Sequence, residues 1–111
     1  MTRAPFQVLV LPWRRAHDGS VEFALVRRAD DGVWQGIAGG GEDDESPADA
    51  ARREAFEEAG IPPASPFMAL DATASIPAHL FPDSSLWGDT IYVIPEYSFG
   101  VDVSAQHLVV A

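Results

Sequence analysis

The stretch Gly39–Ile61, GGGEDDESPADAARREAFEEAGI, decides the fold. It opens on three glycines and continues as an acidic segment with clear signals for the start and end of a helix. Ser46 can cap a helix and Pro47 suits its first position, while Gly60 fits the left-handed conformation that ends one. The stretch therefore predicts a glycine loop that leads into a short helix between Ser46 and Gly60.

Acidic side chains gather on one side of this predicted helix. Glu57 and Glu58 lie three and four positions after Glu54, so the three side chains project from the same face. Alanines at helical spacing occupy a different side, where they can pack on a sheet, namely Ala48, Ala51, Ala55 and Ala59. Neighbouring like charges on a helix repel by roughly 0.2–0.5 kcal/mol per pair. A hard divalent cation would turn that repulsion into ligation, because Mg²⁺ prefers carboxylate oxygens and water.

The three glutamates alone favour a solvated acidic helix face, but Glu45, Arg53 and the glycines at their fixed offsets reverse that interpretation. Together these residues resemble the Nudix box, Gly-x5-Glu-x7-Arg-Glu-U-x-Glu-Glu-x-Gly-U, in which U is a bulky apolar residue. The matching positions are Gly39, Glu45, Arg53, Glu54, Glu57, Glu58, Gly60 and Ile61. Ala55 is a mild departure, since the family favours a larger side chain at that position.

The resemblance implies a site for Mg²⁺ or Mn²⁺. It assigns Glu57 and Glu58 as metal ligands and Glu54 as a ligand or as the group that helps to activate water. Glu45 would join this site directly or through another ligand. The backbone carbonyl before the box glycine, here that of Ala38, is a further ligand in the family.

The resemblance also implies a reaction, the attack of water on a phosphorus atom of a diphosphate. Metal ions neutralise phosphate oxygens and lower the pKa of the attacking water, and a carboxylate removes its proton. Arg53 has a family role in holding a catalytic glutamate, although its position four residues before Glu57 also fits an ordinary helix ion pair. Both roles are compatible.

Composition narrows the class of protein. The chain has 111 residues and a net charge of −10, which fits one small acidic domain spanning residues 1–111. It has no cysteine, which excludes disulfides and thiol catalysis. All of its seven basic residues are arginines, so we expect no broad surface for nucleic-acid backbones. With neither a signal peptide nor an apolar run of membrane-spanning length, a cytoplasmic protein is expected.

The strand pattern predicts an α/β (α+β) fold with the helix on one face of a mixed sheet. Predicted strands cover 6–13, 21–28, 33–38, 67–76 and part of 89–97, with the first two forming a hairpin and Pro95 at an edge or an end. The Nudix resemblance implies a second helix near the C-terminus, but residues up to Ala111 carry no helical pattern. The sequence therefore predicts a C-terminally short domain with one bare apolar face, and we expect a homodimer to cover it.

Several residues are candidates for binding the substrate. Arg27 and Arg28 end the second predicted strand, where one could grip a phosphate bidentately or both could be plain strand-end charges. Trp34 could stack on a base, although a half-buried core position also fits it. Gly39 and Gly40 would let the backbone approach an ion or a phosphate. The sequence around Trp34 looks like the Nudix branch that includes dihydroneopterin triphosphate pyrophosphatase.

One expected catalytic acid is absent from its usual place. The branch just named has an acid followed by histidine near its end, and here Gln106 precedes His107. An amide cannot act as a base, so either another acid such as Glu96 serves or activity is impaired. We expect the histidines to be structural or exposed, and Trp13 and Trp87 to be core residues.

Three functions remain open at this point. The first is a metal-dependent Nudix pyrophosphohydrolase acting on a nucleoside triphosphate or a related diphosphate compound. The second is a catalytically impaired Nudix module that binds a nucleotide or another protein. The third is an acidic domain that binds neither metal nor nucleotide. The intact box favours the first, while Gln106 and the short C-terminus favour the second.

Overall fold

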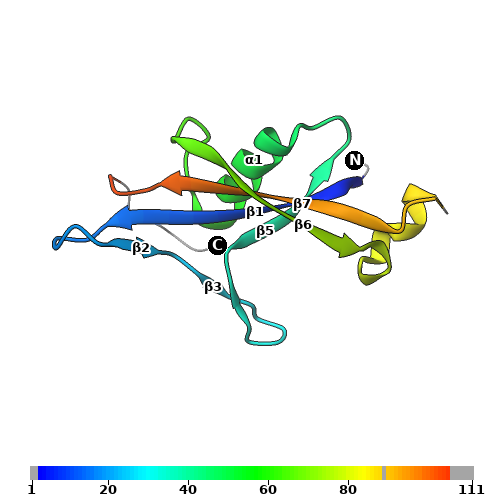
Figure 1. Cartoon of the computed structure of the whole chain (residues 1–111), viewed down its shortest axis with the longest axis horizontal. Helices are drawn as coiled ribbons and strands as arrows, with labels where there is room; N and C mark the ends of the chain where they lie inside the picture. Colours follow the sequence, from blue (N-terminus) through cyan, green and yellow to red (C-terminus); the bar gives the residue numbers. More distant parts are fainter. Residues whose placement is uncertain (1–2, 89, 106–111) are drawn as a thin grey trace.

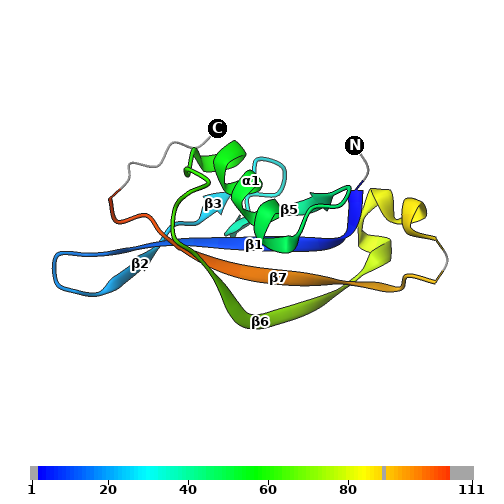
Figure 2. The ribbon, with the colours of Figure 1, turned by 90° about the horizontal axis from the view of Figure 1, so that it is seen from above.

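The computed structural model describes residues 3–88 and 90–105, which form a mixed β-sheet with one α-helix on one of its faces (Figures 1 and 2). The elements in chain order are β1 (Arg3–Arg15), β2 (Val21–Phe23), β3 (Val26–Arg27), β4 (Trp34–Gln35), β5 (Ile37–Glu42), α1 (Pro47–Ala59), β6 (Phe67–Pro77), the 3-10 helices η1 (Ala78–Leu80) and η2 (Pro82–Trp87), and β7 (Val93–Asp102). The predicted α+β class is confirmed.

The long strand β1 organises the sheet, whose order is β2-β1-β7-β6. β1 runs parallel to β7 on one side, and on the other side it pairs antiparallel with β5 and then with β2. Its alternate residues Val8 and Val10 are fully buried on the α1 side. The predicted hairpin of the first two strands is confirmed for β1 and β2.

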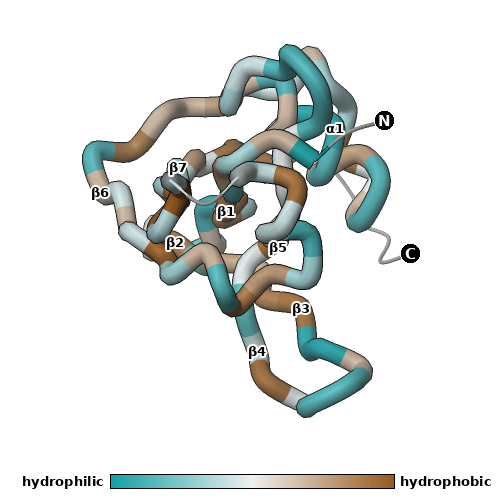
Figure 3. Tube along the Cα trace, turned by 90° about the vertical axis from the view of Figure 1, so that its right-hand side faces the viewer, coloured by the Kyte–Doolittle hydropathy of each residue, from teal (hydrophilic) through white to brown (hydrophobic). Residues whose placement is uncertain are grey.

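The second predicted strand, 21–28, is broken in the structure. The backbone N–H of Ala24 donates to the carbonyl of Pro12 at 2.9 Å, and β3 then leaves the main sheet. β3 pairs instead with β4, and the two form a hairpin that projects from the body of the molecule (Figure 3). The sequence of residues 21–28 could not reveal that the two halves of this segment pair with different strands.

The predicted glycine loop is wrong, because Gly39, Gly40 and Gly41 belong to strand β5. In this strand Gly40 faces Gln7 and Gly39 faces Val8 of β1. Side chains from elsewhere fill the space that a Cβ would take at each glycine: the Glu54 carboxylate at Gly39, the Arg3 guanidinium at Gly40 and the Phe6 ring at Gly41. The glycines therefore serve close packing on both faces of a strand.

Helix α1 begins and ends where the sequence predicts. The Ser46 hydroxyl accepts the backbone N–H of Asp49 at 3.1 Å, and Gly60 adopts φ 68° after the last turn. Its buried alanines are Ala50, Ala51, Ala55 and Ala59. Ala48 is exposed, so the packed face is rotated slightly from the predicted one at the first turn. This face packs on β1, β5 and β7 and closes the main core.

The sheet face opposite α1 exposes apolar side chains, as expected. Phe23 faces Trp13 across β1 and β2, and Met68 faces Gly100 across β6 and β7. A Cβ on Gly100 would meet the Trp13 ring and Leu70, which places these side chains on one face. Phe23 is 59% and Met68 67% exposed.

Two predictions about the later part of the chain are corrected by the structure. Strand β7 extends to Asp102, well beyond residue 97, where the predicted segment ends. The prediction that Pro95 marks an edge or an end of a strand is wrong, because β7 lies between β1 and β6 and continues past Pro95, which pairs with Ser75 of β6 just before the first pair with β1. The C-terminal segment 106–111, with Gln106 and His107, lies outside the described residues. Within the part described, no helix is long and apolar enough to span a membrane.

Candidate functional site

The site is built where α1 crosses β5. The carboxylate of Glu54 lies over Gly39, and its side chain is only 14% exposed. Glu58, one turn later, is partly buried, and Glu57 beside it is 55% exposed. The predicted acidic face of the helix thus lies against the sheet edge rather than entirely in solvent.

Arg53 ties this acidic face to the strand. Its Nη1 donates to Glu54 at 3.0 Å and to Glu57 at 3.3 Å. Its Nη2 donates to the carbonyl of Gly40 at 2.8 Å. The same guanidinium grips both oxygens of Glu45, at 2.8 and 3.0 Å. One cation therefore fixes three carboxylates and the backbone of β5.

Glu45 is held on two sides. Besides Arg53, the backbone N–H of Glu42 donates to its Oε1 at 3.0 Å. The hydrogen bond from Arg53 is the main reason that the pKa of Glu45 is lowered, and the same bond raises the pKa of Arg53. With both oxygens engaged in this way, the geometry suits Glu45 to positioning Arg53.

Glu54 and Glu58 have raised pKa values. Burial is the main cause for Glu54, opposed by its hydrogen bond from Arg53. Burial also raises the pKa of Glu58, and the charges of Glu54 and Glu57 add to the shift. Such crowding of partly buried acids is a cost that a bound cation would relieve.

A cavity of about 580 Å³ lies between α1 and the β3–β4 hairpin. It brings together residues that the sequence analysis predicted for metal and phosphate, namely Arg27, Arg28, Ala38, Glu57 and Glu58. Arg28 is already paired with Asp30 at 2.7 Å, whereas the Nε of Arg27 donates only to the Gly32 carbonyl at 3.3 Å. Trp34 is 63% exposed and does not line this cavity.

The free edge of β5 continues from this cavity to a second one. Because the Gly40 carbonyl accepts from Arg53, it points away from β1. Residues two apart in an antiparallel strand present their backbone groups to the same side, so the Ala38 carbonyl points to that edge too. Beyond it lies a cavity of about 330 Å³, lined by Arg3, Gly40, Glu42, Glu54, Asp83 and Leu86.

The sequence analysis missed the second cavity. Arg3 lay before the first predicted strand, and Asp83 lay in a segment predicted to be irregular. The available signal was the segment 81–87, which has an aromatic residue at each end and turn-forming residues between them, but the sequence does not connect it to β1.

The groups that line the two cavities differ in how well they suit a divalent cation. Within residues 3–88 and 90–105, no group of three or more histidine, cysteine, aspartate or glutamate side chains is arranged to hold a metal ion. The donors nonetheless fit Mg²⁺ in kind, because two carboxylates and one backbone carbonyl line a single cavity.

Glu96, the alternative late acid, lies apart from both cavities. It faces Gln7 and Ala74 across β7, on the sheet face opposite α1. Burial alone raises its pKa. Its position therefore gives no direct support for a role as the base that acts beside Glu57.

Comparison with known proteins identifies the family. The NUDIX domain model matches residues 5–98. The chain belongs to the Nudix family. A protein from Listeria monocytogenes str. 4b F2365, assigned to the NUDIX hydrolases, has a structure with 37% sequence identity and a TM-score of 0.85, over 97% of this chain and 70% of that one.

More distant Nudix structures share the fold. The Escherichia coli dihydroneopterin triphosphate pyrophosphohydrolase has 20% identity and a TM-score of 0.74, over 100% of this chain and 77% of that one. The NUDIX domain of Shewanella oneidensis NrtR, complexed with ADP ribose, has 18% identity and a TM-score of 0.65, over 99% of this chain and 67% of that one. No curated protein is similar enough to the sequence to count as a match.

Proposed function

We propose that this Nudix chain is a hydrolase that breaks a diphosphate bond in a nucleoside triphosphate or a related nucleoside diphosphate compound, with Mg²⁺ or Mn²⁺ as its cofactor. The observation that carries this proposal is the 580 Å³ cavity, in which Ala38, Glu57 and Glu58 lie opposite Arg27 and Arg28. Ligands for a cation and donors for a phosphate thus share one space.

Each residue has a defined part in this proposal. Glu57, Glu58 and the Ala38 carbonyl would hold the ion, which would supply neutralising charge to phosphate oxygens and lower the pKa of water. Arg27 has donors left for a phosphate oxygen, since only its Nε is engaged. Arg53 and Glu45 hold Glu54 in place. They act as positioning residues.

Glu54 is the proposed general base. Its pKa is raised, and its carboxylate lies over Gly39 of β5, where it lines the cavity of about 330 Å³ next to the one that contains Glu57 and Glu58. A base is most effective when its pKa approaches the working pH. Water adds to phosphorus, the bridging P–O bond breaks, and Glu54 takes the proton of the attacking water. The products are a monophosphate and either pyrophosphate or a second phosphorylated fragment.

Formation of the nucleoside monophosphate from a panel of nucleoside triphosphates and ADP ribose, followed by chromatography with and without Mg²⁺, tests the function. We expect Glu57→Gln to lower kcat at least a hundredfold, because it removes a charge from the ion's ligands. Glu22→Gln is the matched control, since Glu22 is exposed and pairs only with Arg14 among the described residues. Equal turnover by the two variants, or turnover independent of divalent ions, would overturn the proposal.

A catalytically impaired binding module is the second candidate. It is favoured by the likeness to the NrtR domain, whose structure holds ADP ribose, and by Gln106 in the place of a late acid. Absence of turnover on every compound in the panel, with ADP ribose binding seen by calorimetry, would favour this module. For either function we propose a cytoplasmic homodimer, on the exposed apolar sheet face and the absence of cysteine.

A further inference from the structure

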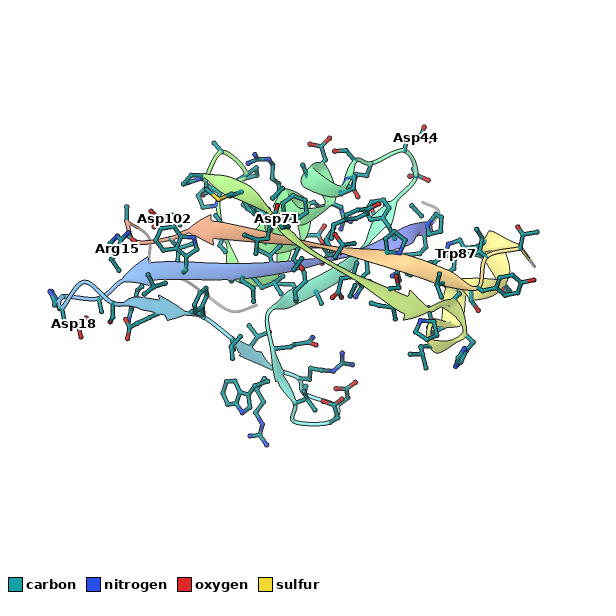
Figure 4. The ribbon with its side chains drawn as sticks, viewed as in Figure 1. Arg15, Asp18, Asp44, Asp71, Trp87 and Asp102 are labelled. Atoms are coloured by element: carbon teal, nitrogen blue, oxygen red, sulfur yellow. The ribbon has the colours of Figure 1, made fainter. Side chains whose placement is uncertain are left out.

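Apart from Glu54, no residue that lines the cavity around Arg3 is assigned a part in the proposed hydrolysis. Arg3 begins β1, where the chain lies beside η2 (Figure 2). Its guanidinium lies over the Phe81 ring at 5.1 Å and the Trp87 ring at 5.8 Å. The Trp87 indole N–H donates to the Arg3 carbonyl at 2.9 Å, which fastens the two segments together. Figure 4 labels Trp87 at this end of the molecule.

Arg3 is held but not neutralised. Among the described residues no carboxylate lies within 4.0 Å of its nitrogens. Its Nη2 donates to the amide oxygen of Gln7 at 2.7 Å, and its Nε is buried without a hydrogen-bond partner. A guanidinium carries five donors, so most of them have no protein acceptor. Burying such a group without acceptors is costly, which points to a ligand that supplies them.

The backbone beneath Arg3 lets its side chain lie flat on the sheet. The guanidinium packs over Gly40, where a Cβ would displace it. Gly40, Gln7 and Glu96 face one another across β5, β1 and β7. They give this end of an otherwise apolar face a row of polar groups. The Gln7 amide of this row lies beside the cation, because its oxygen accepts from Arg3.

The charges around the cavity decide the kind of ligand. Glu42, Glu54 and Asp83 line it together with Arg3. Arg53 offsets part of the charge of Glu54 and Glu42, at 3.0 and 3.7 Å, but Asp83 forms no ion pair within the described part of the chain. A phosphate group, which only accepts hydrogen bonds, would meet net negative charge here. A ligand with acceptors for Arg3 and N–H donors for the carboxylates would be complementary.

We propose that this cavity binds the heterocyclic base of the substrate, one that carries both a ring acceptor or carbonyl and an amino group. Arg3 donates to the acceptors, in the way that arginine recognises the acceptor edge of guanine, and Asp83 accepts from the amino group. The volume of about 330 Å³ lies within the range of small-molecule sites. The proposal rests on the proposed function for the identity of the ligand as part of a nucleotide.

The arrangement of the two cavities fits one extended substrate. Ala38 borders the first cavity and Gly40 the second, two residues along the same strand edge. At about 3.4 Å per residue, the two positions are roughly 7 Å apart. A nucleotide lying along this edge would place its phosphates beside Glu57 and its base beside Arg3. Glu54 and Arg53 would lie between them.

The test measures binding without divalent ions, so it needs no turnover. The indole ¹H–¹⁵N signal of Trp87, assigned with Trp87→Phe, reports on the Arg3 cavity. Guanosine, inosine and ribose 5-phosphate are the probes. We expect guanosine to shift the signal, inosine to bind several-fold more weakly because it lacks the amino group, and ribose 5-phosphate to leave the signal unchanged. A shift by ribose 5-phosphate alone, or by no probe, would overturn the proposal.

Variants separate recognition from a purely structural role of Arg3. Arg3→Met should weaken guanosine binding at least tenfold. Asp83→Asn should weaken it several-fold. Arg14→Met removes the same charge from an exposed site and should change nothing. Asp83→Asn is informative even if Arg3→Met unfolds η2, because no hydrogen bond of Asp83 within the described chain is lost. Unchanged guanosine binding in folded Arg3→Met would make Arg3 only a structural clamp.

The outcome is independent of the hydrolase assay. If guanosine binding depends on Arg3 but the chain shows no turnover, the base site is supported and the hydrolase proposal is refuted. If the chain turns over nucleotides and the KM values are unchanged in Arg3→Met and Asp83→Asn, the hydrolase is supported and the base site is refuted.

Discussion

Arg53 shows how one side chain can organise a whole site. Its planar fork reaches Glu45, Glu54 and the Gly40 carbonyl at once, from a side chain that is 21% exposed. A lysine could not match this geometry, because it offers a point charge instead of a fork. The acidic face of α1 is thus oriented before any ligand arrives. This is the kind of rigid support that catalytic groups need.

Glu58 carries a stability cost that pH can reveal. Its pKa in the folded chain is raised above the ordinary value of 4.5. Folding therefore favours its protonated form, and its carboxylate destabilises the fold as pH rises from 4.5 through the raised value. Without metal, Glu58→Gln should raise the Tm by a few degrees at pH 7 and by nothing at pH 4.

The matched control for this measurement is Asp44→Asn. Asp44 is exposed in the loop before α1, where its side chain points away from the molecule (Figure 4). We expect Asp44→Asn to leave the Tm unchanged at both pH values. Thermal unfolding in a buffer that contains a chelator measures the Tm of both variants. A Glu58→Gln variant no more stable than wild type at pH 7 would show that the crowding of these acids costs nothing.

At the scale of elements, α1 was the part that the sequence predicted best. Its capping serine, first-turn proline and terminal glycine act through contacts within a few residues, so their pattern is visible in the sequence. The box residues on it were predicted for the same reason. Arg53 and the three glutamates owe their common face to helix geometry alone.

Strand β5 was the part that could not be predicted. Three successive glycines favour a loop by their own preferences. They form a strand here because Arg3, Phe6 and Glu54, from other elements, pack where side chains would be. The cavity at Arg3 was missed for the same reason, since it depends on β1, β5 and η2 meeting in space. Such contacts between distant parts leave no local pattern.

The alanine face of α1 makes a prediction about packing. Ala55 is fully buried against the sheet, where the family favours a larger residue. Ala55→Leu should lower the free energy of unfolding by about 2 kcal/mol, since extra atoms in a filled core force strain. Ala48→Leu adds the same atoms at an exposed position on the helix and should change it by less than about 0.5 kcal/mol. Urea denaturation of both variants measures the difference, and equal losses would contradict the packing.

At the scale of the whole molecule, the two faces of the sheet differ. One is covered by α1, while the other exposes Phe23, Met68 and Leu70 among the residues that the structure describes. Apolar side chains grouped in this way favour association. The homodimer predicted from the sequence would bury them. Other exposed apolar side chains among the described residues are spread over β2, the β3–β4 hairpin, α1, η1, η2 and the start of β7.

A charge on this face tests the homodimer. Met68→Glu should convert a dimer to a monomer, as measured by light scattering on a sizing column at about 50 µM, because an unpaired carboxylate in an apolar interface is costly. Leu80→Glu is the control, since Leu80 is 63% exposed on η1, away from this face. A wild-type chain that is monomeric at this concentration would show the homodimer prediction to be wrong.

The glycine edge of β5 has a consequence for how such a site can diversify. Any side chain at Gly39 or Gly40 would displace the Glu54 carboxylate or the Arg3 guanidinium, so a change at this edge would also disturb both of those groups. Selectivity must instead be carried by the segments that approach it, the β3–β4 hairpin on one side and η2 with the start of β1 on the other. Attempts to redirect the protein to another compound should therefore exchange these two flanking segments and leave the bare strand between them untouched.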